Sequence, residues 1–115
     1  MGSTKTDRTE ADLLQGTLDL LILRALQGGA LHGWAISKRI QQMSREVLIV
    51  NQGSLYPALY RLEDRGWIGG KESASSEGRR IKVYALTAAG RRQLAREIDA
   101  WRLFAGAMDH VLRPA

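Results

Sequence analysis

The chain of 115 residues carries a formal net charge of +5 at pH 7 and contains no cysteine. Its length favours one domain, its 44% hydrophobic and 25% charged residues exclude a disordered chain, and the lack of cysteine excludes disulfides and cysteine-ligated zinc. The basic balance suits a polyanionic partner such as nucleic acid, but it is equally compatible with solubility alone.

The first predicted element follows a polar leader. Residues 1–11 are expected to form a flexible tail, and a helix is expected over residues 12–27. Gly28 and Gly29 end this helix, because glycine readily adopts the left-handed cap conformation. The apolar residues that recur at helical spacing on its main face are Leu14, Leu18, Leu21, Ile22, Ala25 and Leu26.

A second helix is predicted to begin near His32 and Gly33. Its inner side carries Ile36, Ile40 and Met43. Lys38 and Arg39 face elsewhere. Such a charged face is usually only solvated, but in a helix-turn-helix the first of the two helices crosses the phosphate backbone.

A third helix is predicted around the run from Gly53 to Ile68, which stops at Gly66 and leads into a strand. Leu55, Leu59 and Leu62 form its inner stripe. Pro57 costs little within the first turn of a helix and distorts it when placed deeper. We therefore expect this helix either to start near Gly53 or to be kinked.

Two strands and a long helix complete the chain. Residues 67–72 and 81–86 are predicted as the strands of a hairpin, joined by the polar link 73–80. Thr87 is a suitable N-cap for a last helix from Ala88 to Leu112. The expected fold is mainly α with a small β-hairpin: a winged helix-turn-helix over residues 12–87, then a dimerisation helix within residues 88–115.

This order of elements predicts a surface for double-stranded DNA. The third helix would enter the major groove and the hairpin would reach the backbone or the minor groove. The candidate DNA-contact residues are Lys38, Arg39, Gln52, Ser54, Tyr56, Pro57, Tyr60, Arg61, Arg79, Arg80 and Lys82. Two other interpretations stay open: an ordinary solvated helical domain, and a protein-interaction module that uses the exposed tyrosines.

The last helix carries a heptad seam, which predicts a homodimer. The candidate interface residues are Leu14, Leu18, Leu94, Ile98, Trp101, Ala105, Met108 and Leu112. Facing copies of Trp101 would form a flat slot able to stack a planar aromatic ligand. Simple packing is the alternative for this tryptophan, and the two roles can coexist. Trp34 is expected at the edge of the core.

Other classes of function find little support in the sequence. His32 and His110 lack metal-ligand spacing, and no set of residues suits nucleophilic or acid–base catalysis. We therefore expect no enzyme, no metal and no cofactor. No stretch approaches the ~20 apolar residues that span a bilayer. No signal peptide is visible, so a cytoplasmic protein without a membrane partner is expected.

Several motifs agree in order and spacing with one known family. They are residues 32–36, residues 53–59, residues 61–63, residues 66–68, and Lys82, Tyr84, Leu86, Thr87 and Gly90. On these motifs the chain resembles the PadR family of transcriptional regulators. The resemblance implies a winged helix with one long terminal helix, a homodimer formed through the last and first helices, and repression at a palindromic operator. It also implies release by a small molecule in some members.

The resemblance also implies roles for single residues. Tyr56 matches the signature recognition-helix residue that contacts DNA, and Ser54 matches the small hydroxyl position before it. Arg79 and Arg80 match the basic wing, and Trp101 matches a tryptophan that lines a ligand slot between subunits. Trp34 and Tyr60 depart from the family pattern, because tyrosine is usual at the first position and a basic or polar residue is common at the second.

Overall fold

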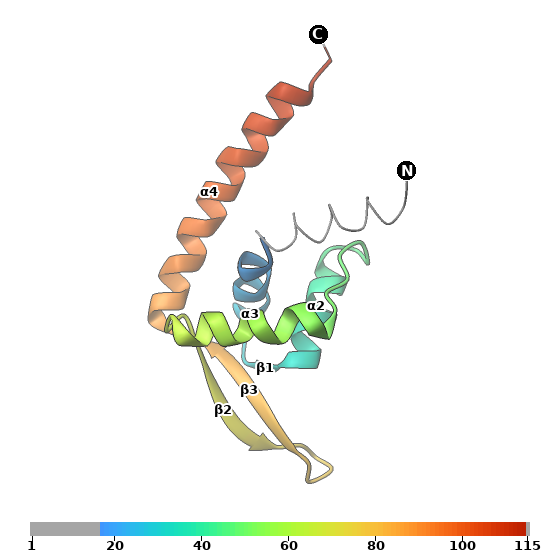
Figure 1. Cartoon of the computed structure of the whole chain (residues 1–115), viewed down its shortest axis with the longest axis vertical. Coiled ribbons are helices and arrows are strands. Elements are labelled where there is room, and N and C mark those ends of the chain that lie inside the picture. The colour runs from blue at the N-terminus through green and yellow to red at the C-terminus, as the bar shows by residue number, and fades with distance from the viewer. Residues whose placement is uncertain (1–16, 115) are drawn as a thin grey trace.

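The computed structural model describes residues 17–114, in which helices surround the base of a β-hairpin (Figure 1). A helix over residues 17–26 comes first. The labelled elements are β1 (Leu31–His32), α2 (Gly33–Met43), α3 (Gln52–Asp64), β2 (Ile68–Ala74), β3 (Arg80–Leu86) and α4 (Ala88–Leu112). This order confirms the predicted winged helix-turn-helix with a long C-terminal helix. The expected tail over residues 1–11 and the candidate interface residue Leu14 lie outside the described residues.

Side-chain caps define where the helices start. The Nδ1 atom of His32 accepts from the backbone N–H of Ala35 at 3.3 Å and begins α2. The Asn51 carboxamide oxygen accepts from Ser54 N at 2.9 Å and begins α3 at Gln52. Pro57 therefore lies inside α3 rather than in its first turn. It has no N–H to donate to the preceding turn of the helix.

The sheet has three antiparallel strands in the order β1-β3-β2. The hairpin pairs Ile68 with Leu86 at its base and Ala74 with Arg80 near its tip. Both strands were predicted from the sequence, although the first begins one residue later than expected and extends to Ala74. The two-residue strand β1 was missed; it pairs Leu31 with Tyr84.

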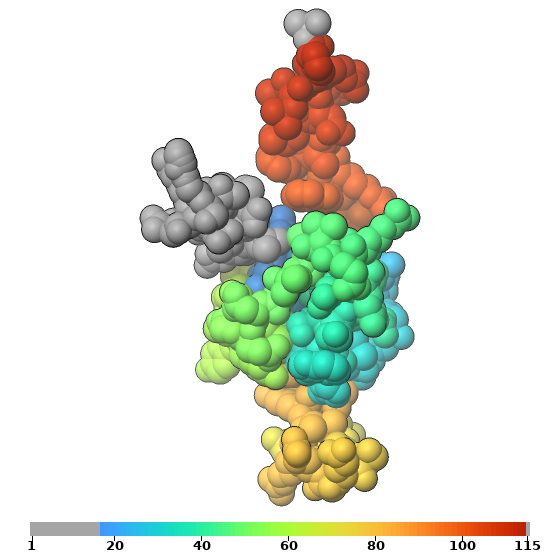
Figure 2. All heavy atoms as spheres, turned by 90° about the vertical axis from the view of Figure 1, so that its right-hand side faces the viewer, coloured from blue at the N-terminus to red at the C-terminus, as the bar shows by residue number. Residues whose placement is uncertain are grey.

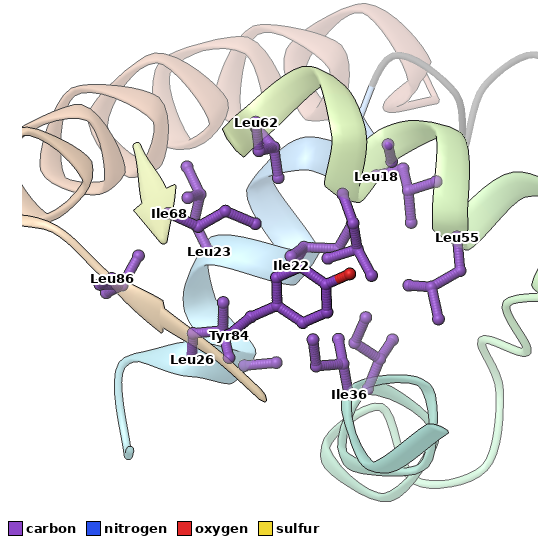
Figure 3. Close-up of a cluster of buried hydrophobic side chains, with 14 of the residues drawn as sticks. Leu18, Ile22, Leu23, Leu26, Ile36, Leu55, Leu62, Ile68, Tyr84 and Leu86 are labelled. Atoms are coloured by element: carbon purple, nitrogen blue, oxygen red, sulfur yellow. The ribbon is translucent and has the colours of Figure 1, made fainter. Parts of the chain in front are cut away.

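The core lies where the helix over residues 17–26, α2 and α3 meet the base of the hairpin (Figure 3). Tyr84 enters this cluster from β3 and is almost fully buried. The largest side chains that are completely buried are Ile22, Leu23, Ile36, Leu55, Leu59, Leu62, Ile68 and Leu94. Burying each of these side chains stabilises the fold by about 1.5–3 kcal/mol.

Two expected dimer contacts belong to this core instead. Leu18 is 4% exposed and Leu94 is 2% exposed, so neither offers a surface to a second chain. Both lie on apolar stripes, but those stripes pack inside the protomer at these positions. Leu94 also ties the start of α4 to the winged domain.

Beyond Ile98, which packs against the core, α4 stands clear of it. Figures 1 and 2 show it projecting from one end of the molecule while the tip of the hairpin projects from the other. The bounds Ala88–Leu112 confirm the sequence prediction at both ends. The large apolar side chains exposed along this projecting part are Trp101, Leu103, Phe104, Met108, Val111 and Leu112.

Candidate DNA-binding surface

Helix α3 has the two-faced character that the sequence predicts. Leu55, Ala58, Leu59 and Leu62 are buried against the core. The candidate contact residues on the other face are exposed: Gln52, Ser54, Tyr56, Pro57 and Tyr60. The N-terminal half of α3 thus presents polar and aromatic groups to solvent, as a major-groove helix would.

Tyr56 is 48% exposed, yet one side of its ring is occupied. Its phenol lies against Gly33, the buried first residue of α2. The two helices of the helix-turn-helix therefore meet at this tyrosine. The place of Gly33 in this surface has no signal in the sequence, because the contact joins two helices separated by a loop.

The first turn of α2 adds an aromatic and cationic patch. Trp34, expected at the core edge, is instead 59% exposed and stacks on His32 with ring centroids 6.3 Å apart. The Lys38 Nζ atom lies 5.4 Å from the centroid of the Trp34 ring, a cation–π contact. The four-residue spacing of Trp34 and Lys38 is the sequence signal for this pair. Arg39 is half-buried on the same helix.

Arg61 differs from the other candidate DNA-contact residues of α3 because it forms an ion pair within the protomer. Its Nη2 atom lies 2.8 Å from the Oδ1 atom of Asp19, on the helix over residues 17–26. The Arg61 side chain is still 40% exposed, and its contact with Asp19 is made through Nη2. Arg61 thus joins two helices of the same protomer, and its contact with phosphate stays a prediction.

The wing, which is the hairpin of β2 and β3, carries exposed cations at its tip and a lysine that is paired with a carboxylate of α3. The Arg79 and Arg80 side chains are exposed at its tip, and Arg80 lies 3.9 Å from Glu72 with its side chain 90% exposed. The Ser75 hydroxyl oxygen accepts from the backbone N–H groups of Glu77 and Arg79, which orders the turn. Two arginines on an ordered turn suit contact with phosphates.

Lys82, by contrast, connects the wing to α3. Its Nζ atom donates to the Glu63 carboxylate at 3.1 Å, and this hydrogen bond raises the pKa of Lys82 above its ordinary value. The lysine also lies over the ring of Tyr84. Burial raises the pKa of Tyr84; Lys82 opposes that rise, while Glu63 and Tyr56 add to it. Lys82 therefore braces the hairpin against α3.

A sequence model of the PadR-like family of transcriptional regulators matches residues 22–96. The match covers α2, α3, the hairpin and the start of α4. The chain belongs to the PadR-like family. Members are transcriptional regulators rather than enzymes, so the chain is a DNA-binding regulator.

Solved structures agree with this assignment. A transcriptional regulator from Clostridium thermocellum is 26% identical, with a TM-score of 0.81 over 89% of this chain and 99% of the other. A PadR-like transcriptional regulator from Bacillus cereus is 27% identical, with a TM-score of 0.76 over 90% and 99%. A PadR family regulator from Clostridium difficile is 32% identical, with a TM-score of 0.71 over 84% and 98%.

A groove of about 890 Å³ lies apart from α3 and its exposed face. It runs between the helix over residues 17–26 and α4, and most of its lining is apolar. Trp101 lines it beside Phe104, with ring centroids 5.9 Å apart, and Glu97 and Asp109 supply carboxylates. Trp101, predicted to line a ligand slot between two subunits, lines this groove within one protomer, and its role in ligand binding stays a prediction.

The described part of the chain, residues 17–114, has neither a helix suited to a membrane nor a cluster of metal-binding side chains. None of the helices there combines the length and the apolar composition that crossing a membrane requires. No group of three or more His, Asp or Glu side chains in that range is arranged to hold a metal ion.

Proposed function

We propose that this PadR-like chain represses transcription by binding a palindromic operator as a homodimer. The observation that carries the proposal is the exposed N-terminal half of α3, which presents Tyr56 and neighbouring polar groups above a fully packed inner face. Two such helices, related by the symmetry of a dimer, would meet successive major grooves about one helical turn apart. Such a regulator would act in the cytoplasm.

The proposed contacts fall into two groups. Gln52, Ser54 and Tyr56 read base edges, with Pro57 and Tyr60 packing beside them in the groove. Lys38, Arg39, Arg79 and Arg80 contact phosphates from α2 and from the wing. Arg61 and Lys82 hold the scaffold in place, because each is already paired with a carboxylate.

The homodimer is supported by the projecting part of α4. Its exposed apolar side chains form a surface that water would disfavour and that a second copy would cover. The proposed interface residues are Ile98, Trp101, Ala105, Met108 and Leu112, which follow the heptad seam. Leu18 and Leu94 support this surface from inside the core.

A small planar aromatic molecule is the proposed signal that releases DNA. The groove beside Trp101 and Phe104 has the apolar lining that such a ligand needs. Quenching of tryptophan emission by aromatic compounds would support this role if Trp101→Ala abolished it. A folded Trp101→Ala dimer that bound the same compound equally well would remove the tryptophan from the ligand site.

The main experiment compares DNA from upstream of the chain's own gene with scrambled DNA, at low and physiological salt. A specific regulator should prefer the first by ~10³-fold or more. Equal binding to both that collapses with salt, together with tight binding to a protein, would favour the protein-interaction module instead.

Two variants and one control refine this comparison. Tyr56→Ala should weaken specific binding by ~1–3 kcal/mol, and Arg79→Ala should flatten the salt dependence by about one phosphate contact for every sequence. Arg113→Ala removes an equal charge at the far end of α4 and should change neither. An unchanged salt slope in Arg79→Ala would take the wing out of the interface.

A further inference from the structure

Gly33 leaves room for the ring of Tyr56. A side-chain Cβ built on Gly33 would lie 2.7 Å from the Tyr56 hydroxyl oxygen, 2.9 Å from Cζ and 3.0 Å from Cε1. Atoms of these kinds do not approach so closely in folded proteins. The phenol therefore occupies the space that any larger residue at position 33 would need.

The backbone does not explain the glycine. Among the described residues, the glycines with positive φ are Gly29, Gly66 and Gly78, so Gly33 has a conformation open to any residue. Glycine also weakens a helix relative to alanine, and Gly33 is the first residue of α2. Its absent side chain is thus accounted for by the contact with Tyr56.

The α2 side of this contact is fixed. His32 caps α2 through Ala35 N, and it pairs with Val83 in the sheet. Tyr56, by contrast, is a half-exposed side chain. If a methyl group were added at position 33, the tyrosine would turn away because the backbone beneath it is held on both sides.

We propose that Gly33 is a positioning residue for DNA reading. Because Gly33 has no side chain, the Tyr56 ring packs against its Cα, and this contact fixes the direction in which the Tyr56 side chain points from between α2 and α3. This inference rests on the proposed role of Tyr56 at the operator. A ring already held in one direction loses less conformational freedom when DNA binds. Functional groups held by such supporting contacts bind more selectively than free ones.

The test is a double-mutant cycle with operator and scrambled DNA. Gly33→Ala should weaken operator binding by about tenfold and leave binding to scrambled DNA unchanged, because only base reading depends on the direction of Tyr56. In a Tyr56→Ala background, Gly33→Ala should change operator affinity by less than about twofold, since the clash is gone. Gly69→Ala is the matched control, as a Cβ there meets nothing within 4 Å.

Each outcome bears on one claim. Operator binding by Gly33→Ala at wild-type strength would overturn the inference while leaving the regulator intact. Equal losses in both backgrounds would also overturn it, because Gly33 would then act without Tyr56. A wild-type protein with no operator preference would instead refute the proposed function.

Folding gives an independent measurement. Thermal unfolding of all four members of the cycle is compared by circular dichroism, without DNA. If Gly33→Ala fails to fold, adding Tyr56→Ala should restore the folded state, because the colliding ring is removed. A double variant that stays unfolded would show that position 33 needs glycine for another reason.

Discussion

The guanidinium of Arg61 lies 2.8 Å from the carboxylate of Asp19, 42 positions earlier in the chain. This pair connects α3, the helix proposed to face DNA, with the helix that contributes Leu20 and Leu21 to the groove beside α4. Its two side chains are 40% and 22% exposed, so water screens part of the attraction. The contact is a structural link between the two faces of the molecule.

Replacing the carboxylate should weaken this link modestly. We expect Asp19→Asn to lower the free energy of unfolding by about 0.5 kcal/mol, as is typical of partly exposed ion pairs. Urea denaturation measures the change. Asp99→Asn, an equivalent change on the exposed side of α4, serves as the control. If both variants unfolded at the same urea concentration as the wild type, the pair would contribute nothing to stability.

The two glycines of α4 should respond oppositely to alanine. A Cβ on Gly90 would collide with the backbone carbonyl oxygen of Trp67, whereas a Cβ on Gly106 meets nothing within 4 Å. Gly90→Ala should therefore destabilise the fold by about 1–3 kcal/mol. Gly106→Ala should leave it unchanged or stabilise it by up to about 1 kcal/mol, because alanine favours helix. Thermal unfolding of the two variants measures this difference. Equal shifts of the melting temperature in Gly90→Ala and Gly106→Ala would contradict the close approach at Gly90.

A charged side chain placed in the apolar seam of α4 should prevent the chain from forming a dimer. Met108→Glu would bury an unpaired carboxylate in the proposed interface, at a cost of about 3 kcal/mol or more. We expect light scattering to report a monomer and operator binding to weaken sharply, since both half-sites can no longer be held together. Ala95→Glu, an exposed position nearer the start of α4, should remain a dimer. A dimeric Met108→Glu would place the interface elsewhere.

Stability should decline in alkali for a specific reason. The hydrogen bond to Glu63 raises the pKa of Lys82 above 10.5, and burial raises the pKa of Tyr84 above 10.0. In both cases the folded state holds the proton more tightly, so the stabilisation is complete below about pH 10 and is lost as the pH rises further. Urea unfolding at about pH 9 and about pH 11 should show this decline.

The variant Tyr84→Phe distinguishes the contribution of Tyr84 to this alkaline decline from that of Lys82. Tyr84→Phe keeps the buried ring but cannot ionise, so its stability should fall less between the two pH values. Glu63→Gln should return the pKa of Lys82 toward 10.5, which lysine side-chain NMR would follow. An identical alkaline decline in Tyr84→Phe and the wild type would rule out a contribution from the tyrosine.

Local patterns in the sequence predicted most of the fold. Thr87 and Pro114 bracket α4, and apolar spacing identified the buried face of α3 and, in α2, Ile36 and Ile40. The prediction was wrong for Met43, which is exposed at the end of α2 where the core no longer covers the helix. Strand β1 was missed because two residues carry no periodicity. It exists only through pairing of Leu31 with Tyr84, far along the chain.

The candidate site was predicted less completely, because its details depend on contacts between distant segments. A stripe of leucines does not reveal whether its partner is the same chain or another, so Leu18 and Leu94 were assigned to the wrong surface. Arg61 has the chemistry of a phosphate ligand, but Asp19 lies within its reach in the folded chain. Which partner each side chain contacts depends on which segments lie close together in the folded chain, and the spacing of residues along the sequence does not reveal this.

The corner between the wing and α4 is held by three contacts. The Thr87 hydroxyl donates to the Gly66 carbonyl at 2.6 Å, Thr87 N donates to the Trp67 carbonyl at 3.1 Å, and Gly90 fits against that same carbonyl. The end of α3 must therefore turn with the first turn of α4.

Over its 25 residues α4 spans about 37 Å, so a tilt of about 5° displaces its far end by about 3 Å relative to this corner. In a dimer joined along α4, the distance between the two α3 helices would depend on the angle at which the far ends cross. Operator spacing would then be a mechanical property of the helix pair, adjustable by substitutions that never approach DNA.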